Sequence, residues 1–173
     1  YYINDYGNQI NNFAKSVYLR IRELLFDEPF TNETNLYPGE YIVNIAKNII
    51  KKSDNKFEVF EKNKDYLISE SLKYSMKMIK EDLKKLGIEH DNFFSETELV
   101  KKNLVQKSIT QLKDNNYVEE GYLEPPKGEE QKNWKKTKRL IFKSTSYGDD
   151  ADRALQKNDG SWTYFANDLA YHM

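Results

Sequence analysis

The sequence contains no cysteine, which excludes disulfides, thiolate nucleophiles and cysteine-based zinc sites. Histidine is almost as scarce: His90 and His172 are the only two, and their wide separation argues against a histidine metal site. No apolar run approaches the roughly 20 residues of a membrane span, and the mean hydropathy is −0.88. With no visible targeting signal, we expect a cytoplasmic protein in a reducing compartment, without a membrane partner.

The chain also lacks an excess of either charge, because it has 27 basic and 28 acidic residues. This balance excludes a globally basic nucleic-acid binder but leaves room for a locally basic face. The run Lys132–Arg139 with Trp134 inside it could contact phosphates, or it could be a solvated loop. A length of 173 residues suffices for one domain with its own core and a satellite subdomain.

No initiator methionine is present, and the chain opens on Tyr1–Ile3, which reads as the interior of a strand. A last helix, expected from near Asp168, would have two turns at most, and helices that short are marginal alone. We therefore expect a piece of a longer polypeptide.

Apolar spacing predicts helices along most of the first half of the chain. A strand at 1–3, a turn and a helix over 10–25 form a strand–turn–helix unit, the basic step of a nucleotide-binding α/β fold. A loop follows over 27–39. Further helices are predicted over 40–51, over 65–86 with Gly87 as its stop, and over 105–112.

Strands are predicted mainly in the second half. Residues 91–96 form a short aromatic strand, and Ser95 with Glu98 fits a capping box for the next helix. Strands are expected over 117–123 and 139–145. The segment Asn158-Asp159-Gly160 predicts a hairpin between 154–157 and 161–165, with the type I′ turn that Asp-Gly favours.

The strongest candidate site is the pair Tyr164 and Asp168. We expect the strand over 161–165 to deliver Tyr164, and then a buried Asp168, at the mouth of a new helix. A carboxylate can accept two parallel N–H bonds from a guanidinium, and a tyrosine adds a third contact, which indicates an arginine site. The alternative is that Asp168 and Asn167 merely cap the helix.

Three other segments carry weaker signals. Glu96 follows a strand and could face a ligand cleft, or it could simply complement the dipole of the next helix. The turn over 4–9 could present backbone N–H groups to an anion, or act only as a helix cap. The acidic stretch Gly148–Arg153 lacks the spacing of an EF-hand loop, so we expect a turn with surface ion pairs.

Taken together, these segments resemble the arginyl-tRNA synthetases, a family of class I aminoacyl-tRNA synthetases. The matching blocks occur in the family's order: INDYGNQI (Ile3–Ile10), PGEYI (Pro38–Ile42), LGIEHDNFFSE (Leu86–Glu96), YVEEGYL (Tyr117–Leu123), FKSTSYGDDADRAL (Phe142–Leu155) and KNDGSWTYFANDLAYH (Lys157–His172). The resemblance implies a Rossmann-like α/β catalytic domain. It also implies ATP-dependent activation of L-arginine, with ATP and Mg²⁺ as a substrate complex, and transfer to tRNA(Arg).

The resemblance also implies roles for particular residues. Tyr164 and Asp168 match the family's Tyr-x-x-x-Asp arginine-binding pair, and Glu96 matches the acidic residue beside the arginine side chain. The family's catalytic cleft is lined at positions matching Asp5, Gly7, Gln9 and His172. No catalytic residue, metal ligand or tightly bound cofactor is expected in this chain, which we expect to be a monomer.

The chain departs from the family in lacking the HIGH and KMSK motifs that serve ATP. We therefore expect residues 1–26 to belong to the catalytic core, 27–145 to be connective insertions, and 146–173 to start the amino-acid-binding part. Alone, the chain is expected to be inactive. The alternative is a non-catalytic module, derived from the synthetase, that binds arginine or RNA.

Overall fold

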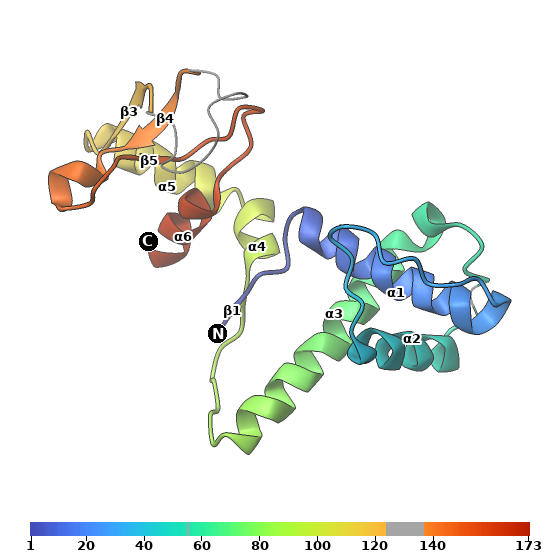
Figure 1. Cartoon of the computed structure of the whole chain (residues 1–173). Helices are drawn as coiled ribbons and strands as arrows, with labels where there is room; N and C mark the ends of the chain where they lie inside the picture. The colour runs from blue at the N-terminus through green and yellow to red at the C-terminus, as the bar shows by residue number, and fades with distance from the viewer. Residues whose placement is uncertain (55, 124–136) are drawn as a thin grey trace. The chain divides into compact units, whose positions relative to one another are not determined.

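A computed structural model describes residues 1–54, 56–123 and 137–173, which form two compact units, Tyr1–Phe94 and Ser95–Met173. Figure 1 shows the first as mainly helical and the second as helices with a small sheet. The architecture is thus a mixture of helix and sheet. The boundary between the units does not coincide with the three functional segments expected from the sequence, which remain a prediction.

The first unit is built on three helices: α1 (Asn8–Phe26), α2 (Glu40–Lys52) and α3 (Phe60–Lys85). All three predicted helices are confirmed, and so is the irregular segment between α1 and α2. Figure 1 shows α1 and α2 side by side, with α3 against α1. Their facing sides share one core, made of Phe13, Ala14, Val17, Ile21, Ile42, Ile45, Ala46, Ile49, Phe57 and Leu67.

Helix α3 begins at Phe60, five residues before the predicted start. The missed turn has no continuous apolar stripe, but Phe60 packs on the core and its ring lies 5.4 Å from that of Tyr18. The end of α3 is as predicted. Gly87 has a φ of 74°, its N–H donates to the Lys84 carbonyl, and the Ile88 N–H donates to the Leu83 carbonyl. This pair of bonds is the Schellman arrangement of a glycine-terminated helix.

The predicted terminal strand and aromatic strand are both present, as β1 (Tyr2–Ile3) and β2 (Phe94–Ser95) in a two-stranded sheet. Within the first unit, the Tyr1 amine donates to the Asn92 carbonyl and the Tyr1 carbonyl accepts from the Phe94 N–H. One residue bonded to two positions that flank a third is the pattern of parallel strands.

The second unit contains α4 (Glu96–Lys101), α5 (Leu104–Asp114) and α6 (Tyr164–His172). Its sheet has the order β3 (Val118–Gly121), β4 (Arg139–Phe142) and β5 (Arg153–Ala154), and both pairings are antiparallel. Val118 pairs with Phe142, and Ile141 pairs with Ala154. Helix α6 packs against α5 and α4 (Figure 1).

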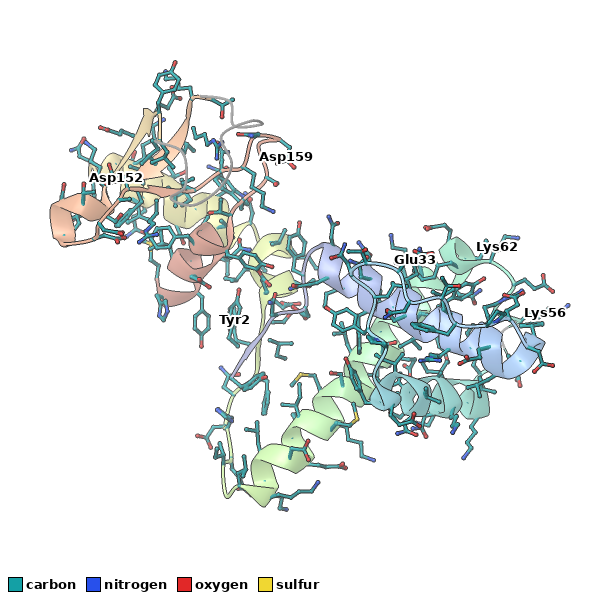
Figure 2. The ribbon with its side chains drawn as sticks, in the orientation of Figure 1. Tyr2, Glu33, Lys56, Lys62, Asp152 and Asp159 are labelled. Carbon is teal, nitrogen blue, oxygen red and sulfur yellow. The ribbon has the colours of Figure 1, made fainter. Side chains whose placement is uncertain are left out.

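The strand predicted over 139–145 is too long. It ends at Phe142, and a 3₁₀ helix follows over Ser144–Tyr147. The side chain of Asp152, which lies beyond this 3₁₀ helix in the sequence, stabilises it by accepting hydrogen bonds from the Thr145 N–H and hydroxyl, at 3.0 and 2.7 Å. Figure 2 labels Asp152 at this loop and Asp159 at the hairpin tip.

The hairpin exists, but its turn is not type I′. The Lys157 N–H donates to the Ser161 carbonyl at 2.8 Å, so three residues form the loop, and only the last, Gly160, has a positive φ (82°). A three-residue loop that ends in a left-handed glycine is the next most common hairpin class. Asp159 favours this form, because its carboxylate accepts from the Ser161 N–H and hydroxyl.

The predicted strand over 161–165 is also wrong. Beyond a single bridge between Gln156 and Trp162, the chain enters α6 at Tyr164, four residues before the helix start expected near Asp168. The N-cap is Thr163, whose hydroxyl accepts from the Ala166 N–H at 3.3 Å and donates to the Ala154 carbonyl at 2.8 Å. Hydroxyl capping by Thr163 outweighed the apparent strand pattern.

Candidate functional site

The second unit contains a buried polar contact between two helices. The Asn167 side-chain amide donates to Oε1 of Glu96 at 2.6 Å, and the two residues are only 5% and 2% exposed. Asn167 is on α6 and Glu96 is the first residue of α4. The sequence separation of 71 residues makes this bond a tertiary link that local pattern analysis could not reveal.

Of the two roles that the sequence left open for Glu96, the structure bears on the one in which it complements the dipole of the next helix. It lies in the first turn of α4, where the helix dipole favours a negative charge. The turn itself is fixed by Ser95, whose hydroxyl accepts from the Glu98 N–H at 3.3 Å, as the predicted cap requires. Yet Glu96 is buried beside Asn167, unlike an ordinary solvated first-turn charge. Its role towards a ligand remains a prediction.

Tyr164 and Asp168 lie one helical turn apart on the same face of α6, so the structure brings this predicted pair together. Tyr164 is 61% exposed, and Asp168 is exposed rather than buried as expected. Asp168 is in mid-helix, so the reading in which it caps the helix is wrong. The exposed face therefore offers a phenol and a carboxylate to solvent, while Asn167 points inward.

Sequence reasoning overlooked Asn167 as a possible site residue, because the late helix start made it look like a cap. With Thr163 taken as the cap, Ala166, Asn167 and Ala170 fall on one stripe, and all three are buried. A polar residue inside such a stripe needs a hydrogen-bond partner. That signal could have identified Asn167.

His172 is the last residue of α6 and is exposed, with its ring 5.2 Å from that of Tyr171. It follows Asp168 by four residues and continues the exposed face that carries Tyr164. That His172 lines a ligand cleft remains a prediction.

The other three predicted cleft residues belong to the first unit, so the structure describes them separately from Glu96 and Asp168. Asp5 and Gly7 are in the turn before α1, and Gly7 is its N-cap, with φ 97° and ψ −174°. Gln9 donates to the Asn4 side-chain oxygen at 2.6 Å. The turn therefore caps α1, and the hydrogen bond from Gln9 to Asn4 stabilises it. Its role towards a ligand remains a prediction.

Gln9 also lines a hollow of about 330 Å³ in the first unit, together with tyrosine rings and α3 side chains. Among the described residues in its lining are Asn4, Tyr37, Tyr41 and Met76, but neither Asp5 nor Gly7. This hollow is large enough for a small ligand group.

The acidic stretch forms the expected turn with ion pairs. Arg153 binds Asp149 through both Nε and Nη2, at 2.6 and 2.5 Å, and contacts Asp150 at 3.2 Å. These hydrogen bonds from Arg153 hold the pKa of the Asp149 carboxyl well below its usual range. Over the ranges that the structure describes, no three acidic or histidine side chains gather as a metal site.

Two further findings concern membranes and nucleic acids. Among the described residues, no helix has the length and apolar character needed to cross a bilayer. Most of the basic run Lys132–Arg139 lies outside the described residues, which resume at Thr137. Of its last part, Lys138 forms an ion pair with Glu120 at 2.6 Å.

The candidate site of the second unit is rich in hydrogen-bond acceptors, some buried and some exposed. Glu96 and Asp168 are acceptors when ionised, and Asn167 Oδ1 is buried without a hydrogen-bond partner among the described residues. Tyr164 adds a hydroxyl on the outer face of the same helix. Such a set suits a cationic ligand with several N–H donors.

Comparison with known proteins gives one consistent result, although no protein-family model matches the chain. The arginine–tRNA ligase of Pelagibacter ubique is 56% identical over 99% of the chain, and that of the Brugia malayi Wolbachia is 49% identical over 99%. In each case the match covers 30% of the relative.

A solved structure described as an arginyl-tRNA synthetase of Campylobacter jejuni matches 99% of the chain and 34% of its own length. Its TM-score is 0.74 at 28% identity, so the fold and the sequence lead to the same enzymes. The chain spans about 30% of the length of the curated relatives it matches, and over nearly all of its own length it is similar to one segment of these arginine–tRNA ligases.

Proposed function

We propose that the chain supplies the arginine-recognition part of an arginine–tRNA ligase, which activates L-arginine with ATP and transfers it to tRNA(Arg). The observation that carries this proposal is the arrangement on α6. Tyr164 and Asp168 share its outer face, while the next inward residue, Asn167, binds the buried Glu96 at 2.6 Å. In a chain 56% identical to an arginine–tRNA ligase, these are the residues that would receive the arginine side chain.

In this proposal, Asp168 and Glu96 bind the guanidinium and Tyr164 contacts it from the same helix. A guanidinium is planar and carries five N–H donors, so several acceptors can be satisfied at once. Lysine has a compact ammonium with three donors and would leave acceptors unpaired. Unpaired buried polar groups are costly, and this cost provides selectivity against lysine.

We also infer a Rossmann-like catalytic core for the complete enzyme. The support is the parallel hydrogen-bond pattern of Tyr1 with Asn92 and Phe94, because β1 and β2 are separated in sequence by three helices. Parallel strands need such a crossover, and βαβ units are the building blocks of that core.

ATP and Mg²⁺ enter this proposal only as substrates of the complete enzyme. The described residues offer no cluster of three metal-ligating side chains, so no residue of this chain is assigned to Mg²⁺. The sequence has neither a HIGH nor a KMSK motif. We therefore expect no aminoacylation by the chain alone in an assay with arginine, ATP and tRNA(Arg).

We further infer that the protein is cytoplasmic and monomeric.

Calorimetric titration of the chain with L-arginine and L-lysine tests the proposal. Arginine-selective binding is expected. It should weaken about tenfold to a hundredfold in Asp168→Asn, the scale of a hydrogen bond to a charged group. Asp150→Asn is the matched control, because Asp150 is another exposed aspartate of the same unit, at the acidic turn.

Each other outcome has a defined meaning. Equal affinity of the parent and Asp168→Asn for arginine would remove Asp168 from the site. Arginine-selective binding, together with a longer polypeptide that does not aminoacylate tRNA, would favour the alternative of a non-catalytic arginine-binding module.

A further inference from the structure

The contact between Asn167 and Glu96 is unusual within this chain. It joins two helices through side chains that are at least nine-tenths buried, with 2.6 Å between the Asn167 amide nitrogen and Oε1 of Glu96. By contrast, the ion pair between Lys138 and Glu120 lies at the surface. A buried carboxylate needs such a donor, because burial without one disfavours its charged form.

The place of Asn167 in α6 gives the contact a second consequence. Asn167 follows Tyr164 by three residues and directly precedes Asp168. A bond from Asn167 to Glu96 therefore fixes the rotamer of Glu96 relative to the helix that carries both other predicted arginine ligands. An error of about 1 Å in such a site can cost a large factor in binding or rate.

The orientation of the Asn167 amide sets the balance of donors and acceptors. Its nitrogen is directed to Glu96, so its Oδ1 is left as a buried acceptor, and no donor among the described residues satisfies it. An unsatisfied buried acceptor is costly, and a ligand N–H group that reached it would remove that cost. A guanidinium brings five.

We propose that Asn167 is a positioning and specificity-determining residue for arginine. It keeps the Glu96 carboxylate ionised and in one orientation, and its Oδ1 adds to the demand for a donor-rich ligand. This inference rests on the proposed function for the identity of the ligand. Its structural half, that the Asn167 amide orients the Glu96 carboxylate, does not depend on any ligand.

Carboxyl-carbon NMR of the ligand-free chain tests that half. In Asn167→Leu, which has no donor and a similar volume, Glu96 should titrate at a clearly higher pH than in the parent, because its charged form loses the hydrogen bond. In Asn167→Asp, two carboxyls occupy the contact and should share a proton, so Glu96 should titrate as one of a coupled pair.

Leu99→Ala is the matched control for lost stability, since Leu99 is a buried residue of the same helix as Glu96 but an apolar one. It should lower the unfolding temperature and leave the Glu96 titration unchanged. If Asn167→Leu does not fold, Asn167→Asp decides, because its side chain has the size of the original. A Glu96 titration equal to the parent's in every folded Asn167 variant would overturn the inference.

The specificity half is read by calorimetry with L-arginine and L-lysine. Asn167→Leu should reduce arginine affinity about tenfold to a hundredfold and reduce the preference over lysine. An altered Glu96 titration with unchanged preference for arginine would overturn the specificity role. A parent chain that binds no arginine, but shows the Glu96 shift, would count against the proposed function and not against the hold on Glu96.

Discussion

At the scale of single residues, Gly7 is required by its backbone conformation and not by lack of space. A Cβ placed on Gly7 would meet no atom within 4 Å, but φ 97° with ψ −174° lies in a region essentially restricted to glycine. Gly148 provides the contrast. It too has room for a Cβ, but its φ of 94° and ψ of 8° are left-handed helical values, which asparagine tolerates.

We therefore expect Gly7→Asn to destabilise the first unit by about 1–3 kcal/mol, the usual range for a residue forced into such a region. Gly148→Asn should cost the second unit clearly less. Urea unfolding followed by NMR signals of each unit separately measures both changes. Equal costs at the two positions would mean that the conformation at Gly7 is not the constraint.

At the scale of elements, Thr163 decides where α6 begins. Its hydroxyl accepts from the Ala166 N–H and donates to the Ala154 carbonyl, and its own N–H donates to the Leu155 carbonyl at 3.1 Å. The same residue therefore starts the helix and fastens that start to the end of β5. Tyr164 and Asp168 take their places from this attachment.

Thr163→Val keeps the shape and removes the hydroxyl, so it should destabilise α6 by about 1–2 kcal/mol through the lost cap and the unpaired Ala154 carbonyl. Thr163→Ser retains both bonds and should come close to the parent. Hydrogen exchange at the first amides of α6 is the direct measurement. Similar protection in the valine variant and the parent would show that packing alone sets the helix start.

Most helices were predictable from sequence because apolar spacing and end signals agreed. Gly87 stops α3 and Ser95 caps α4, both through their own local bonds. The start of α6 was not predictable in this way, since its aromatic residues suggested a strand and the Thr163 cap depends on a carbonyl of β5. The link from Asn167 to Glu96 required the tertiary fold. Local chemistry could therefore identify Tyr164 and Asp168 as a pair, but not the helix that presents them.

At the scale of the whole molecule, carboxylates in both units have lowered pKa values. The main cause in each is a hydrogen bond from a neighbouring side chain: Arg20 to Glu23, Arg22 to Glu28, Lys138 to Glu120, Arg153 to Asp149 and Ser161 to Asp159. A carboxyl with a lower pKa in the folded state stabilises the fold above its unfolded pKa, and this stabilisation is lost as pH falls through the folded value.

The unfolding temperature should therefore change little between about pH 7 and 5 and then fall below about pH 4.5, near the ordinary pKa of a glutamate. Thermal unfolding monitored by circular dichroism across this range is the measurement. Glu28→Gln removes one such group, so its decline on acidification should be shallower than the parent's. An unfolding temperature that rises below pH 4.5 would contradict the sign of the argument.

The attachment of α6 to β5 has a practical consequence for labelling. Thr163 holds the helix from the strand side, so the loop 158–160 closes the hairpin without setting the helix position. Lengthening a flexible loop costs only about 0.6 kcal/mol for each doubling of its length, to which an insertion here adds the loss of the hydrogen bonds from Ser161 to Asp159. A short tag or a fluorophore site inserted between Asp159 and Gly160 should leave Tyr164 and Asp168 in place, which makes this tip a suitable anchor for following ligand capture on a surface.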